Sequence, residues 1–180
     1  MDLLKKTLIN LALILIGFII YFIQVNFFSW FTINGIKPNL FIIYILFIGL
    51  FGNRSMGIIY GAISGIFLDL IYENNVGINL TGLVLIGLLA ILFNKNFSKD
   101  SRITIMFMVF GTTIIFEVLT YFIKYVLYST NIEVLSFIKI LIVEVIYNIL
   151  ITIIIYPLMQ KFGYYIENTY KRNKILTRYF

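Results

Sequence analysis

Six apolar runs, separated by short polar segments, fill most of this 180-residue chain. They occupy approximately residues 7–28, 38–52, 56–72, 80–93, 103–125 and 137–159. A run of about 20 apolar residues can cross the hydrocarbon core of a bilayer as one α-helix. A soluble domain in which 61% of the residues are hydrophobic would expose enough apolar surface to aggregate. The sequence therefore predicts a single all-α, polytopic membrane domain with six transmembrane helices, followed by a basic tail at residues 160–180.

The chain contains no cysteine and no histidine. This excludes disulfides, thiolate zinc sites, Cys or Ser–His nucleophiles and imidazole proton shuttles. The remaining polar residues form no pattern that presents a nucleophile to a base. We therefore predict a protein that is not an enzyme, with no catalytic residues, no cofactor and no metal. The net charge of +6 flanks membrane spans, so no nucleic-acid partner is expected.

The lysines and arginines divide unequally between the two sides of the membrane that six spans would create. With the N-terminus in the cytoplasm, the outer side holds only Lys37, Lys124 and Lys139. Cytoplasmic segments of membrane proteins are enriched in Lys and Arg, so the asymmetry predicts that both termini are cytoplasmic. The cytoplasmic set is Lys5, Lys6, Arg54, Lys95, Lys99, Arg102, Lys161, Lys171, Arg172, Lys174 and Arg178.

Two residues are expected at helix starts. Pro38 suits the first turn of the second run, because the N–H that proline lacks would be unpaired there. Asn79 can cap the fourth run by accepting a hydrogen bond from a free backbone N–H.

The basic tail allows two interpretations. Its Lys and Arg residues can act as a topology signal alone. Alternatively, Phe162, Ile166 and Tyr170 recur every four residues, which is the spacing of an interfacial helix that rests on anionic lipid.

Glycines recur at every fourth position in "GIIYGAISGIFLDL", at Gly57, Gly61 and Gly65, and the next step is Asp69. Small residues at this spacing let helices pack closely, either inside the bundle or against a partner protein. We expect the third and fourth runs to approach here. Asp69 would then accept hydrogen bonds from the free N–H groups where the fourth run begins, near Asn79.

Two further carboxylates, Glu117 and Glu144, lie inside the fifth and sixth runs. A charge in a membrane span costs about 2.5–3.5 kcal/mol, so each should face a partner or a cavity. We expect a polar cluster in which both glutamates either pair with Lys124 and Lys139 or share a proton, with Asn148 nearby. The cluster can be an interhelical clamp, a ligand or proton pathway, or a contact with a partner's span.

Taken in order, three motifs resemble the MreD family of bacterial rod-shape-determining membrane proteins. They are "KPNLFII" from Lys37 to Ile43, the glycine series that ends at Asp69, and "GIN" from Gly77 to Asn79. The family pattern has Pro-Asp-Leu at the start of the second span. Here Pro38 is followed by Asn39, which lacks that charge but keeps the capacity to cap a helix.

The resemblance implies a multi-pass protein of the bacterial cytoplasmic membrane that acts as a non-enzymatic scaffold of the cell-elongation complex and supports lateral peptidoglycan synthesis. The implied partners are the bitopic protein MreC, the actin-like MreB filament, and the glycan polymerase and transpeptidase of wall synthesis. The implied fold is similar to the substrate-binding subunits of energy-coupling-factor vitamin importers. A substrate-capture subunit is therefore the alternative function, although Ala12 and Gly17 do not form the Ala-x3-Ala pair typical of such subunits.

Overall fold

The computed structural model describes residues 2–73, 75–129 and 133–171, and it is all helical apart from loops and one isolated bridge between Ile33 and Ile36. This confirms the all-α prediction. Six α-helices are present, and α1 continues into a short π-helical turn, η1. The elements are α1 (Asp2–Phe22), η1 (Ile23–Phe27), α2 (Leu40–Phe51), α3 (Met56–Tyr72), α4 (Ile78–Asn96), α5 (Arg102–Tyr128) and α6 (Val134–Lys171).

Four of these helices are long and apolar enough to cross a membrane: α1 with η1, α4, α5 and α6. The other two, α2 and α3, have 12 and 17 residues. A 12-residue helix is only about 18 Å long, which is shorter than the hydrocarbon core of about 30 Å. The chain is therefore an integral membrane protein in which α2 is too short to span the bilayer unaided.

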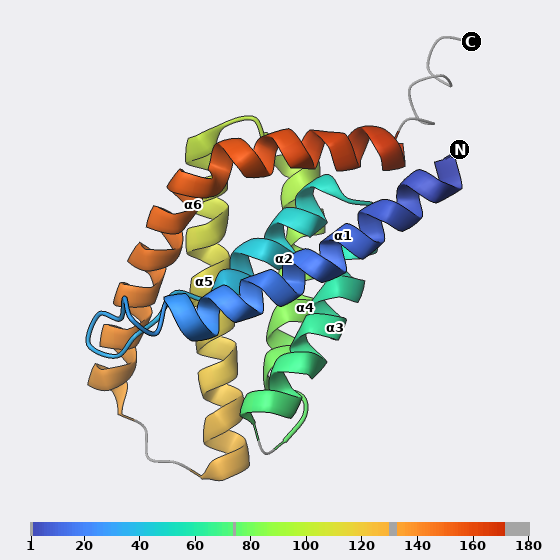
Figure 1. The fold of residues 1–180 in the computed structure, drawn as a ribbon. Coiled ribbons are helices and arrows are strands. Elements are labelled where there is room, and N and C mark those ends of the chain that lie inside the picture. Colours follow the sequence, from blue (N-terminus) through green and yellow to red (C-terminus); the bar gives the residue numbers. More distant parts are fainter. Residues whose placement is uncertain (1, 74, 130–132, 172–180) are drawn as a thin grey trace.

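The short helix α2 forms the centre of the fold. All twelve of its residues are buried, from Leu40 to Phe51. Helix α1 crosses obliquely over α2, and the other helices surround it (Figure 1). A helix that is apolar on every side is stable only when other elements cover it completely. Helix α2 therefore organises the core, and its neighbours carry the surface that faces lipid.

Glycines bring α2, α3 and α4 into backbone contact. A Cβ atom added to Gly57 would lie 2.8 Å from the Cα of Gly49 in α2 and 3.2 Å from the Cα of Gly87 in α4. Added to Gly61 it would lie 2.6 Å from the carbonyl oxygen of Leu83. These atoms belong to backbones and cannot move aside, so only glycine fits. The structure thus places the glycine series against partners inside the bundle.

Gly65 continues the same contact toward the C-terminal end of α3. Its added Cβ would lie 2.4 Å from the Cα of Leu80, in the first turn of α4. The three glycines therefore lie along one continuous α3–α4 interface that ends beside the loop joining the two helices.

Helix α6 bends, and its second half runs across one end of the bundle toward the start of α1 (Figure 1). Pro157 lies inside the helix and removes a backbone hydrogen bond, which accounts for the bend. The helix continues to Lys171, so residues 160–171 are not a separate tail. The remaining tail residues, including Arg172, Lys174 and Arg178, lie outside the described residues.

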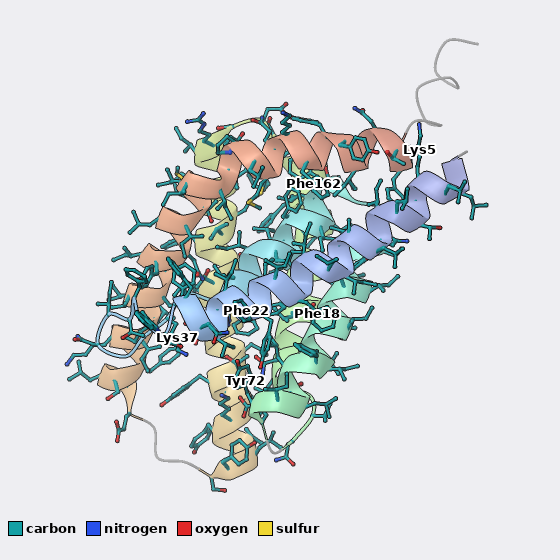
Figure 2. The ribbon with its side chains drawn as sticks, in the orientation of Figure 1. Lys5, Phe18, Phe22, Lys37, Tyr72 and Phe162 are labelled. Carbon is teal, nitrogen blue, oxygen red and sulfur yellow. The ribbon has the colours of Figure 1, made fainter. Side chains whose placement is uncertain are left out.

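The apolar stripe of the expected tail faces protein, which disfavours the alternative in which this stripe rests on lipid. Ile166 is fully buried, and Phe162 packs against the core (Figure 2). The hydroxyl of Tyr170 donates to Oδ1 of Asn10 at 2.9 Å. A four-residue stripe shows which residues share a face, but it does not show what covers that face.

Polar contacts fasten the second half of α6 to the α4–α5 loop. The hydroxyl of Tyr156 donates to the carbonyl oxygen of Asp100 at 2.7 Å, and that of Tyr164 donates to the Asp100 carboxylate. Lys99 forms an ion pair with Glu167 at 2.5 Å. This half of α6 therefore caps the end of the bundle where α1 also begins.

Replacing Gly61 or Gly65 by alanine should destabilise the protein by about 1–3 kcal/mol, because the new methyl group would overlap the backbone of α4. The measurement is the thermal unfolding midpoint of the purified protein in detergent. Gly111→Ala is the matched control, since nothing lies within 4 Å of a Cβ added there. Equal effects of Gly61→Ala and Gly111→Ala would contradict the close α3–α4 contact.

Candidate functional site

The carboxylate of Asp69 is fully buried near the C-terminal end of α3 and accepts four hydrogen bonds. Oδ2 accepts from the backbone N–H groups of Gly77 at 2.8 Å and Leu80 at 3.1 Å. Oδ1 accepts from the backbone N–H of Asn79 at 2.7 Å and from its side-chain Nδ2 at 2.9 Å. These donors include the free N–H groups at the start of α4, where the helix dipole favours negative charge. Asp69 thereby fixes the α3–α4 loop.

The start of α4 differs from the expected start at Asn79. Gly77 is the N-cap residue, and Asn79 lies in the first turn, with its side chain on Asp69. Gly77 has φ = +132°, a conformation that other residues rarely adopt. The glycine therefore lets the loop turn its N–H toward the carboxylate.

Side chains from two other elements cap the buried start of α2. Oδ1 of Asn148 in α6 accepts from the N–H of Asn39 at 2.9 Å, and Oε1 of Gln24 in η1 accepts from the N–H of Leu40 at 2.9 Å. The Asn39 side chain, which was expected to cap the helix, makes no capping bond. Pro38 lies before the helix rather than in its first turn. Capping from other helices satisfies N–H groups that water cannot reach.

The antiparallel helices α5 and α6 meet along a polar seam. Nδ2 of Asn148 donates to Oγ1 of Thr113 at 3.1 Å, and both side chains are fully buried. One turn along each helix from this bond, at i+4 on α5 and i−4 on α6, the register sets Glu117 opposite Glu144. The structure thus brings together both glutamates and Asn148 from the expected cluster.

Among the described residues neither lysine forms an ion pair with the glutamates, although Lys124 remains near enough to Glu117 to act on it electrostatically. Lys124 forms an ion pair with Glu73 at the end of α3, at 2.6 Å. Lys139 is exposed and lines a shallow groove between α6 and the turn at residues 33–36. A flexible lysine reaches several candidate partners, and Lys124 forms its ion pair with Glu73 rather than with Glu117.

The described residues include no group of three or more acidic side chains that could hold a metal ion. Asp69, Thr113 and Asn148 join different segments of the bundle through buried hydrogen bonds, while the buried Thr112, Thr120 and Thr152 bond carbonyl oxygens of their own helices. This chemistry holds a membrane bundle in one conformation.

Several residues of the site were not identified from the sequence. Gln24 and Thr113 are single polar residues in apolar runs. Such a residue is expected to make a buried polar contact, but the sequence does not show with which residue. Gly49 and Gly87 contact Gly57 from two other helices. They lie outside the series of glycines at every fourth position, so that series did not identify them. Glu73 was taken as a loop residue.

Asp69→Asn should destabilise the protein by about 3 kcal/mol. The variant replaces one carboxylate oxygen by an NH2 group, which would then face backbone N–H groups and accept no hydrogen bond from them. Asn79→Ala removes one of the four bonds and should cost about 1 kcal/mol. The exposed Glu133→Gln provides the control. Thermal unfolding in detergent measures all three, and an Asp69→Asn variant as stable as the control would contradict the assignment.

Comparison with known proteins gives one match. The model of the family described as rod shape-determining protein MreD matches residues 1–166. No curated protein and no solved structure matches this chain. Because the match covers most of the 180 residues, the chain belongs to the MreD family of rod shape-determining proteins.

Proposed function

We propose that this protein is a non-enzymatic scaffold that holds components of the bacterial cell-elongation complex together in the cytoplasmic membrane. The family match over residues 1–166 carries the proposal. The fold supports it, because the conspicuous polar residues are used for contacts within the bundle. Such a frame can bind partners through lateral helix packing and loop contacts.

Helix α1 offers the surface that we assign to the bitopic partner MreC. Only 11% of the most apolar 18-residue segment of this helix is buried, which is the lowest share among the four long helices. Leu4, Leu8, Leu11, Leu15, Phe18 and Phe22 are all exposed along it. These residues alternate steps of four and three, the spacing with which two helices pack side by side. Phe18 and Phe22 are labelled on α1 in Figure 2.

We assign the end of the bundle that the second half of α6 covers to the cytoplasmic side, where it would contact the MreB filament and anionic lipids. The loops at the opposite end would contact the glycan polymerase and transpeptidase. Lys5 and Lys6 of α1 lie at the end where α6 crosses the bundle (Figure 2). Basic groups at a cytoplasmic membrane surface attract anionic headgroups.

The importer alternative has weaker support. Asp69, one of its three candidate ligand groups, is already occupied by four donors of the protein itself. The proposed likeness to importer subunits rests on the family resemblance and on the number of helices. We therefore do not propose substrate capture.

The orientation can be tested with single cysteines, because the chain has none of its own. Thr32→Cys lies in the exposed α1–α2 loop and Ser98→Cys in the exposed α4–α5 loop. With both termini cytoplasmic, a membrane-impermeant thiol reagent should label Thr32→Cys in spheroplasts and should label Ser98→Cys only after the membrane is opened. The reverse pattern would contradict this orientation.

The scaffold is tested by co-purification with MreC from native membranes, combined with cysteine cross-linking. Leu11→Cys and Leu15→Cys on α1 should cross-link to single cysteines in the transmembrane span of MreC. Phe107→Cys and Val118→Cys, on the exposed face of α5, are the matched controls and should not.

Cross-links confined to α5 would move the partner surface away from α1 and leave the scaffold intact. Recovery of ATPase subunits in place of MreC and wall synthases would overturn the scaffold in favour of the importer. Depletion should produce rounded cells rather than a nutrient auxotrophy.

A further inference from the structure

The geometry of the α5–α6 seam brings two carboxyl groups together inside the membrane. The bond between Asn148 and Thr113 fixes the relative position of the antiparallel helices. One turn further out, this alignment sets Glu117 opposite Glu144. Beyond the glutamates, four residues along α5 and seven residues back along α6, the tilted rings of Tyr121 and Phe137 lie with centroids 4.3 Å apart. The two glutamates are therefore held face to face by contacts on both sides.

These carboxyl groups lack the donors that a pair of charges would require. Glu144 is 6% exposed, and its Oε1 has no hydrogen-bond partner among the described residues. Asp69 shows the opposite solution in the same molecule, with four N–H donors on one buried carboxylate. Glu144 is thus a deeply buried acceptor oriented toward a second acidic side chain, with one oxygen free.

Among the described residues no lysine forms an ion pair with either glutamate, although the charge of Lys124 still acts on Glu117. Lys124 is bound to Glu73, Lys37 donates to Ser29, and Lys139 is exposed. The tyrosine hydroxyls also have other partners, since Tyr147 donates to Phe31 and Tyr44 donates to Leu13. The charged and titratable groups of the surrounding outer half are Tyr21 on α1, Lys37 in the α1–α2 loop, Tyr44 on α2, Asp69, Tyr72 and Glu73 on α3, Tyr121, Lys124, Tyr125 and Tyr128 on α5, and Glu133, Lys139 and Tyr147 at and along α6.

We propose that Glu117 and Glu144 form one proton-binding site, in which a single proton is shared between the two carboxyl groups. Two adjacent carboxylates in a medium of low dielectric cannot both remain charged, and a shared proton supplies the missing donor. The pair carries one negative charge when the proton is bound and two when it is released. A metal ion fits less well, because no third acidic ligand accompanies them among the described residues.

Proton release would act on the seam itself. Two like charges repel each other, and Glu144 is one turn from Asn148, which caps α2. The loaded site therefore keeps α5 and α6 closed over the start of α2, and the empty site loosens that contact. This role goes beyond the proposed scaffold and does not depend on the identity of its partners.

Infrared spectroscopy tests the site in the purified full chain in an ester-free detergent. At neutral pH the wild type should show the carbonyl stretch of a protonated carboxyl group, and this band should disappear as the pH rises. Labelling glutamate with 13C should shift the band, because the acid is a glutamate and not Asp69. Among the other glutamates, Glu73 and Glu167 are bound to lysines and Glu133 is exposed.

Variants assign the band to the pair. Glu117→Gln combined with Glu144→Gln should abolish it, and the control Glu133→Gln should leave it unchanged. Absence of the band at neutral pH in the wild type, or its survival in the double variant, would overturn the proposal. The isotope experiment needs no variant, so it remains decisive even where a substitution prevents folding.

The seam can be followed with spin labels on Phe122→Cys in α5 and Ile138→Cys in α6, both exposed positions. The distance between the labels should lengthen over the pH range in which the band disappears. It should stay constant in the Glu117→Gln, Glu144→Gln background. An unchanged distance in the wild-type background would overturn the coupling between proton release and the seam.

Discussion

The architecture depends on burying a helix that is too short to cross the membrane. Helix α2 has twelve residues and all are buried, so its first N–H groups lie where no water can satisfy them. Asn148 and Gln24 reach that end from α6 and η1, and each supplies one acceptor. These bonds tie α2 to elements far away in the sequence. The surrounding helices cover α2 and present their own exposed apolar side chains to lipid.

Three carboxyl groups lie within the bundle, and their surroundings differ in kind. Asp69 receives backbone donors from the start of α4, made possible by a glycine-lined approach of two helices. Glu144 has one oxygen without a donor in the described part of the chain and lies opposite Glu117 in the register of the α5–α6 seam. The first arrangement fixes a loop through donors of the protein itself, and the second leaves a buried acceptor beside a second acidic side chain. One small bundle thus contains both the fixed contact at Asp69 and the pair of glutamates at the α5–α6 seam.

The sequence predicted the helices and the Asp69 contact because local spacing determines both. A series of three glycines followed by an acid one turn later aligns a tight interface with the next helix start. The sequence did not predict which lysine forms an ion pair with which carboxylate, since Lys124 pairs with Glu73 and not with Glu117. It also did not show that Ile166 is buried, because a four-residue stripe is the same against lipid or protein. Partners distant in the chain leave little trace in local patterns.

The contact between the two ends of the described chain has a consequence for biosynthesis. The hydroxyl of Tyr170 reaches Asn10 and the carbonyl oxygen of Lys6, while Tyr60 also donates to Asn10. Helix α1 leaves the ribosome long before residue 170 is made. Contacts from α2 and α3, through Tyr44 and Tyr60, can form earlier, and the contact from the far end of α6 is the last to become possible. The side of α1 that meets α6 is therefore the last part of this interface to be covered during synthesis.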